Sequence, residues 1–178
     1  VGRTTLPGYA PLVEPDYFVL YASHVQRRFL PQVVDHYRLS QPEYTVRVNG
    51  LEYAWVYANT FYRDEALAAL ATIEDRSDPE RDAVLFNVDA AVRRYYTGEM
   101  TIKSVAGPPR DDFVLSALAR ASEGVDRLWF VTFPRTYEES AQAIRGALTM
   151  RAEQVDWVRV GEIGATCFDV AGVRFVRK

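Results

Sequence analysis

Short apolar runs alternate with amphipathic stretches along most of the chain, a pattern typical of strands and helices that share a core. Runs rich in β-branched and aromatic residues, bounded by turn residues, predict buried strands at 17–21, 83–87, 100–105 and 128–133. Amphipathic or Ala- and Leu-rich stretches predict helices at 31–38, 64–74, 89–96, 111–122 and 136–150.

The clearest local signal is Asn49-Gly50, which separates the alternating runs 44–48 and 51–57. Asn-Gly favours a type I′ turn, because both of its central residues need positive φ. We therefore expect a β-hairpin here. At the other end of the chain, residues 157–178 predict two or three strands with a turn at Ala171-Gly172.

From residue 83 onward strands and helices alternate, and such βα units imply a parallel sheet. We predict an α/β protein with a Rossmann-like layered sheet, mostly parallel, with antiparallel hairpins at its edge. Residues 1–60 would form a partial module of strand, helix and hairpin, and residues 61–178 a complete module. One continuous domain is the alternative.

A weak internal repeat supports two related modules. Asp16–Leu20 resembles Asp126–Phe130, each followed by a predicted helix, and Val48–Tyr53 resembles Val170–Phe175. The alternative is that α/β units share this pattern without being related. If the repeat is real, the first copy lacks its opening strand and helix.

Composition narrows the class of protein. The 178 residues are 48% hydrophobic and 25% charged, which excludes disordered and collagen-like chains. The net charge of −3 gives no overall basic field, so we expect no nucleic-acid partner. No apolar run approaches the roughly 18–20 residues of a spanning helix, so we expect no membrane insertion by this chain. The start at Val1, without Met, suggests a mature form or an excised fragment.

Cysteine and histidine usage argues against metal sites and most cofactor sites. Cys167 is the only cysteine and lies in an apolar alternating run, which predicts a buried structural thiol, although a Cys–His nucleophile pair stays open. His24 and His36 have no cysteine nearby at zinc-ligand spacing. The chain also lacks a glycine-rich phosphate loop, a P-loop and GxSxG. We therefore expect no metal and no cofactor.

Three predicted strand-to-helix junctions carry side chains suited to an anion. Ligands of open parallel sheets bind beyond the carboxyl ends of strands, and helix N-termini and arginines favour phosphate or carboxylate. The alternative is that the Ser, Asp and Asn residues only cap helices. The candidate ligand-binding residues are Ser23, His24, Arg27, Asn87, Asp89, Arg93, Arg94 and Arg135.

Aromatic residues add two weaker candidates for sugar binding. Tyr53, Trp55 and Tyr57 would share one strand face, as sugar platforms do, or would simply pack across strands. The run 93–96, Arg-Arg-Tyr-Tyr, could grip a sugar phosphate, although neighbours on a helix face different sides.

Two stretches carry a family resemblance. Pro15–Arg28 and the segment 44–57, which ends in Tyr-Ala-Trp-Val-Tyr, resemble the C-terminal soluble region of bacterial membrane glycosyltransferases. These are dolichyl-phosphate-mannose–protein mannosyltransferase-like proteins, especially those of Chloroflexi-type genomes. Arg81–Asn87 and Arg94–Gly98 resemble a second part of that region. His24 departs from the amide or similar polar residue expected at its position.

The resemblance implies a parent enzyme that spans the membrane many times and transfers a sugar from a polyprenyl phosphate. The family's catalytic acid lies in a loop that this chain does not contain, so no catalytic residue is carried over. We expect a non-catalytic domain outside the cytoplasmic membrane, tethered by the membrane-embedded portion of the same polypeptide. Its role would be scaffolding or recognition of a carbohydrate or protein acceptor. The alternative is a soluble α/β enzyme acting on a sugar nucleotide or sugar phosphate.

Overall fold

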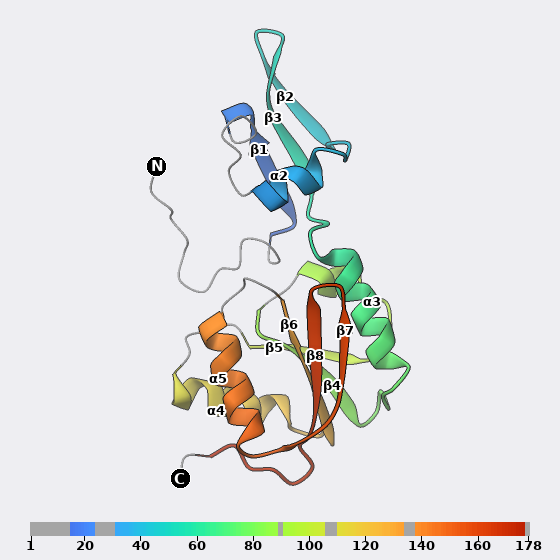
Figure 1. The fold of residues 1–178 in the computed structure, drawn as a ribbon, viewed down its shortest axis with the longest axis vertical. Helices are drawn as coiled ribbons and strands as arrows, with labels where there is room; N and C mark the ends of the chain where they lie inside the picture. The colour runs from blue at the N-terminus through green and yellow to red at the C-terminus, as the bar shows by residue number, and fades with distance from the viewer. Residues whose placement is uncertain (1–14, 24–30, 89–90, 106–109, 134–137, 177–178) are drawn as a thin grey trace. The chain divides into compact units, whose positions relative to one another are not determined.

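The computed structural model in Figure 1 describes residues 15–23, 31–88, 91–105, 110–133 and 138–176. The chain divides into two compact units, one formed by Pro15–Phe61 and the other containing the described residues from Tyr62 onward. Each unit has its own sheet. The two units are described separately below.

The 15–61 unit is an antiparallel sheet with a helix on one face. Its elements are β1 (Tyr17–Tyr21), α2 (Pro31–Tyr37), β2 (Tyr44–Val48) and β3 (Leu51–Ala58). The strand order is β1-β3-β2, so the last strand lies in the middle. The predicted hairpin is confirmed: Asn49 and Gly50 link β2 to β3 with φ of 51° and 79°, as a type I′ turn requires.

The core of this unit lies between the sheet and α2. Tyr37 of α2 packs against Phe18 of β1 and Tyr57 of β3, with ring centroids 5.4 and 5.0 Å apart. Val33, Val34 and Leu20 are buried in the same unit. Phe18 and Leu20 alternate with exposed neighbours, so β1 has one buried and one open face.

A β-bulge at Tyr53 overturns the expected aromatic platform. Val46 pairs with Ala54 but Arg47 pairs with Glu52, which leaves Tyr53 as an extra residue of β3. The extra residue breaks the alternation of faces. Tyr53 consequently meets the ring of Tyr21 edge-on, whereas Tyr57 packs against α2.

The second unit contains a five-stranded sheet in the order β5-β4-β6-β8-β7. Its elements are α3 (Arg63–Glu74), β4 (Asp82–Phe86), the 3₁₀ helix η1 (Ala91–Arg94), β5 (Thr101–Ser104), α4 (Asp111–Ala121), β6 (Arg127–Thr132), α5 (Glu138–Thr149), β7 (Glu153–Val160) and β8 (Ile163–Asp169).

The molecule is a mixed α/β protein, and the prediction of a mostly parallel sheet is wrong. Only β5, β4 and β6 run parallel. After α5 the chain returns as the hairpin β7–β8, which turns at Gly161-Glu162, and β8 then pairs antiparallel with β6. The expected turn at Ala171-Gly172 lies beyond β8 and joins no pair of strands in the described chain.

The predicted helix over 89–96 is also wrong in its described part, which is η1 of only four residues followed by a turn. The longer helical patterns predicted the structure correctly. The helices expected near 64–74, 111–122 and 136–150 are confirmed as α3, α4 and α5.

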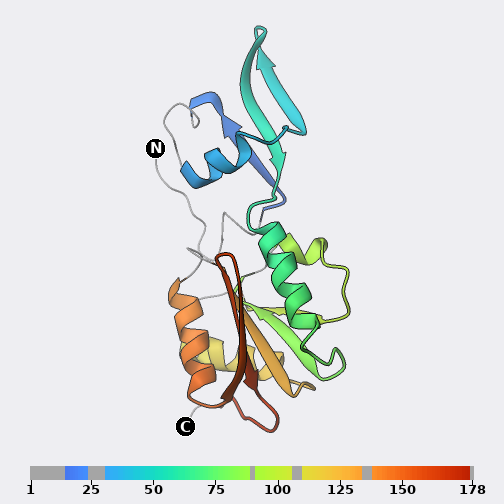
Figure 2. The ribbon, with the colours of Figure 1, turned by 45° about the vertical axis from the view of Figure 1, so that its right-hand side comes forward.

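Helices cover both faces of the five-stranded sheet, as Figure 2 shows. On one face α4 and α5 bury Leu85, Phe130 and Phe168 in a continuous core. On the other, α3 packs against β7 and β8 through Ala66, Ala69, Leu70 and Ile73. Strand residues facing that side include Trp129 and Cys167, which are paired across β6 and β8.

The two units share one strand topology. The hairpin β2–β3 places β3 beside β1, and the hairpin β7–β8 places β8 beside β6 in the same antiparallel sense. Even the end contacts match: Asn59 N–H donates to the Asp16 carbonyl over 2.7 Å, and Val170 N–H to the Asp126 carbonyl over 2.8 Å. The predicted match of the strands after Asp16 and Asp126 agrees with this topology. The predicted match of Gly50 with Gly172 is wrong, because Gly161 occupies the equivalent turn.

Candidate functional site

At the carboxyl end of β4, the connections that follow the parallel strands of the second unit leave toward opposite faces of the sheet. The connection after β4 contains η1, which contacts α3 on one face of the sheet. The connections after β5 and β6 contain α4 and α5, which pack together on the opposite face. In open α/β sheets, ligands bind at the point where the connections from two neighbouring parallel strands leave toward opposite faces of the sheet. We call the carboxyl ends of β4, β5 and β6 the carboxyl edge.

Asn87 lies at the centre of the carboxyl edge. It follows β4 directly, and its side chain is buried among apolar neighbours such as Phe86 and Val88. The backbone beside it is fixed, because Val105 N–H donates to the Phe86 carbonyl over 2.8 Å. At 1% exposure the Asn87 side chain lies inside the fold, where it can position the carboxyl edge from within.

Arg93 brings positive charge to the same edge. Its Nη1 donates to the Ser104 hydroxyl at the end of β5 over 3.3 Å, so the guanidinium bridges the segments that follow β4 and β5. Arg94 is the next residue of η1, and both arginines are exposed. Arginine recognises phosphate and carboxylate oxygens in a bidentate manner.

The remaining candidates divide between the units and the undescribed segments. Ser23 is exposed after β1 in the 15–61 unit, so it belongs to a different sheet from Asn87, Arg93 and Arg94. The other candidates, His24, Arg27, Asp89 and Arg135, lie outside the described residues. Ser104 is the one contributor to the carboxyl edge that the sequence did not indicate, since only the parallel pairing of β4 and β5 brings it near Arg93.

Cys167 is a buried thiol, as predicted. Its side chain lies on the α3 face of β8, and burial raises its pKa to about 12. Arg127 opposes this shift in the pKa without overcoming it. The thiol therefore stays protonated at neutral pH, and a protonated thiol is a poor nucleophile.

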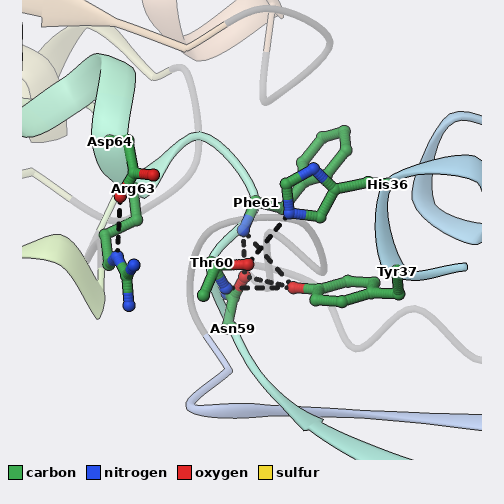
Figure 3. A network of polar contacts seen from close by, with 7 residues as sticks. All are labelled: His36, Tyr37, Asn59, Thr60, Phe61, Arg63 and Asp64. Atoms are coloured by element: carbon green, nitrogen blue, oxygen red, sulfur yellow. Dashed lines mark hydrogen bonds and ion pairs between the residues drawn. The ribbon is translucent and has the colours of Figure 1, made fainter. Parts of the chain in front are cut away.

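The 15–61 unit contains a polar network that sequence patterns did not reveal (Figure 3). The Tyr37 hydroxyl donates to Asn59 Oδ1 over 3.2 Å and accepts the N–H groups of Thr60 and Phe61 over 3.0 and 3.3 Å. Asn59 Nδ2 donates to the Pro15 carbonyl over 2.7 Å. The network thus ties α2 to both ends of the unit, which is a structural task.

His36 joins the same network from the solvent side. Its Nε2 lies 2.9 Å from Thr60 Oγ1, and its ring meets those of Tyr37 and Phe61 edge-on. The spacing resembles a base beside a hydroxyl, but Thr60 also donates its backbone N–H to the buried Tyr37. We infer that the contact between His36 and Thr60 holds the end of β3 in place.

The opposite, amino end of β4 and β6 holds an open depression of about 360 Å³ lined by charged residues. The buried Asp82 accepts bidentate hydrogen bonds from Arg127, at 2.9 and 2.5 Å. Arg81 pairs with Asp126 on its rim. In the described part of the chain no group of three His, Cys, Asp or Glu side chains could hold a metal ion. The two arginines pair with two of the four aspartates that line this end and join its strands, so the lining keeps an excess of negative charge.

Comparison with protein families, with curated proteins and with solved structures finds no match for this chain. Among the helices of the described segments, none combines the length and apolar character required to cross a bilayer.

Proposed function

We propose that this chain is a non-catalytic recognition domain that binds an anionic group at the carboxyl edge. The observation that carries the proposal is the position of Arg93, bound to Ser104 beside the buried Asn87, at the point where connections leave toward opposite faces. In this proposal β4, β5 and β6 act as a Rossmann-like half-sheet. Phosphate or carboxylate on a saccharide fits the donors present.

The chemistry of the donors favours binding over catalysis. Asn87, Arg93 and Ser104 offer N–H and O–H groups, which stabilise negative charge but do not take up a proton at neutral pH. Cys167 is a protonated thiol beneath α3. These properties support a domain that holds a ligand without transforming it.

The biological setting that we propose follows the sequence resemblance. Pro15–Arg28 and Tyr44–Tyr57 resemble the soluble region of membrane glycosyltransferases that use polyprenyl-phosphate sugars. We propose that the chain lies on the extracytoplasmic side of the membrane, tethered by the membrane-embedded portion of its polypeptide. There it would recognise the saccharide or protein acceptor, while the sugar transfer takes place elsewhere in the polypeptide.

A titration followed by ¹⁵N–¹H NMR tests the binding site. Glucose 1-phosphate should give saturable shifts at residues 86–88, 91–94 and 104–105, and glucose alone should give smaller ones. Replacing Arg93 and Arg94 with Ala should weaken binding at least tenfold. Arg145→Ala, an exposed arginine of α5, is the matched control and should bind normally. Shifts confined to the amino end of β4, or equal binding by the double variant, would contradict the proposal.

A second assay separates recognition from catalysis. The purified chain is incubated with a polyprenyl-phosphate sugar or with nucleotide sugars, each together with candidate saccharide and peptide acceptors. We expect no product in either case. Sustained turnover with a nucleotide sugar would instead support a soluble sugar-nucleotide enzyme.

A further inference from the structure

We propose that the uncovered face of the 15–61 sheet is a docking surface for an amphipathic α-helix. This open face is the side of the sheet opposite α2. Strand pairing places eight side chains on it, and all are apolar or tyrosine: Tyr17, Val19, Tyr21, Tyr44, Val46, Ala54, Val56 and Ala58.

The open face is apolar, and its flanking residues are accessible. Tyr17 and Tyr44 are 55% and 65% exposed, and Val19 and Tyr21 are also exposed, whereas Val46, Val56 and Ala58 are half-buried and Ala54 is buried. In the described residues no helix is packed on this side of the sheet, since α2 contacts Phe18 and Tyr57 on the other. A continuous exposed apolar patch without charge is typical of an interaction site.

The side chains are graded in size across the sheet. The middle strand β3 contributes Ala54, Val56 and Ala58. The flanking strands contribute the tyrosines, with Tyr17 and Tyr21 on β1 and Tyr44 on β2. A helix on this face would therefore contact mainly the exposed tyrosines and Val19 of the flanking strands, and tyrosine is a residue enriched at interfaces.

The second unit shows what covers such a face. Its strands β6, β8 and β7 repeat the order and directions of β1, β3 and β2. By strand position, Trp129 and Val131 of β6 correspond to Val19 and Tyr21 of β1. Trp129 is fully buried and Val131 almost fully, because α3 packs on that face. The equivalent residues in the first unit are exposed.

The helix α3 also indicates the chemistry of the occupant. Its buried residues, Ala66, Ala69, Leu70 and Ile73, form one stripe at helical spacing, while Asp64 and Glu65 begin the helix. We therefore commit to a partner helix with small and aliphatic residues at positions i, i+3, i+4 and i+7, and with no charge on that stripe. Leu and Ile would pack against Val19 and the exposed tyrosine rings.

The test uses a synthetic peptide of residues 62–76 as the probe and the full chain as the receptor, followed by ¹⁵N–¹H NMR. We expect saturable shifts at Val19, Val46 and Val56. Changing both Tyr17 and Tyr44 to Ser should weaken binding at least tenfold. Leu39→Ser is the matched control, because Leu39 is 96% exposed in the same unit but lies outside the sheet. It should leave binding unchanged.

Several outcomes would overturn the proposal. The first is that millimolar peptide causes no chemical-shift changes on the open face, and the second is that the changes are confined to the second unit. The third is that a variant peptide with Lys in place of Leu70 and Ile73 binds as tightly as the original peptide. Concentration-dependent dimerisation that the Tyr17/Tyr44 variant abolishes would show that a second copy occupies the face. Circular dichroism and the dispersion of the NMR spectrum establish that each variant is folded.

Discussion

At the scale of single residues, buried polar side chains determine where segments of this chain are fastened. The Tyr37 hydroxyl serves as donor once and as acceptor twice, and all of its partners lie after the end of β3. Leaving buried N–H groups without a partner costs more than the hydrogen bond itself contributes. One hydroxyl therefore has a large effect on the boundary of the 15–61 unit.

Replacing Tyr37 with Phe should destabilise that unit by about 1–3 kcal/mol, because the Thr60 N–H loses the Tyr37 hydroxyl as its acceptor and the Phe61 N–H keeps only Asn59 Oδ1, at 3.1 Å. Hydrogen exchange at these two amides is the measurement, and it should accelerate. Tyr44→Phe is the control, since Tyr44 is exposed on the sheet, and should leave exchange unchanged. Unaltered protection in Tyr37→Phe would show that the network is unimportant for stability.

The buried thiol of Cys167 predicts a pH dependence of stability. Its pKa is raised from 9.0 to about 12 in the folded chain, so above pH 9 the unfolded state loses the proton while the folded state keeps it. This contribution to stability is complete below pH 9 and is lost between pH 9 and 12, by at most about 1.4 kcal/mol per pH unit.

Comparing the parent chain with Cys167→Ala isolates this contribution, because all other titrating groups are common to both. Urea unfolding between pH 8 and 10.5 should show a steeper loss of stability in the parent chain. Parallel pH profiles would mean that the thiolate is not disfavoured in the folded state.

At the scale of elements, local sequence patterns correctly predicted the features that depend on residues close together in the sequence. The Asn49-Gly50 hairpin and the helices α3, α4 and α5 depend on turn chemistry and helical spacing, which neighbouring residues determine. The position of β8 between β6 and β7 depends on pairing between distant segments, which the alternation of βα units does not encode. In the described part of 89–96, where we expected a helix, the chain forms only the 3₁₀ helix η1. The spacing of polar and apolar residues was therefore too weak a signal to predict the structure there.

In the candidate site, too, the sequence indicated residues that follow a strand directly but not residues that strand pairing brings together. Asn87 and Arg93 could be identified because both follow the apolar run of β4 in sequence. Ser104 could not, since its proximity to Arg93 arises from the parallel ladder of β4 and β5. The Tyr37–Asn59 network was likewise hidden, because tyrosine in an apolar helical stripe is indistinguishable from an ordinary core residue.

The ion pair between Asp82 and Arg127 joins β4 to β6 in addition to the parallel ladder of the two strands. Asp82 is buried and also accepts the Asp78 N–H over 2.9 Å. Asp82→Asn should destabilise the second unit by about 3 kcal/mol, because it leaves a partly buried guanidinium without its counter-charge. Equilibrium unfolding measures this. Asp112→Asn, at an exposed position of α4, is the control and should change stability by no more than about 0.5 kcal/mol.

At the scale of the whole molecule, one strand topology occurs twice with different surroundings. In the second unit α3 and α5 cover both faces of β6, β8 and β7, whereas in the first unit no helix of the described residues lies on the face opposite α2. Removing apolar surface from water is the main favourable term in folding, so the covered sheet is the more self-sufficient of the two. Its main buried cluster contains only residues between Ala83 and Phe175.

We therefore predict that residues 62–178 fold without the 15–61 unit. The fragment should give a dispersed NMR spectrum, and Cys167 should remain unreactive toward a thiol reagent at pH 8, because α3 still covers it. A shorter fragment, 82–178, lacks α3 and exposes the face that holds Trp129 and Cys167. Its thiol should react readily, and the fragment should bind hydrophobic dyes or aggregate. Equal protection of the thiol in both fragments would show that α3 is not what covers this face, and a disordered 62–178 fragment would show that the two units fold only together.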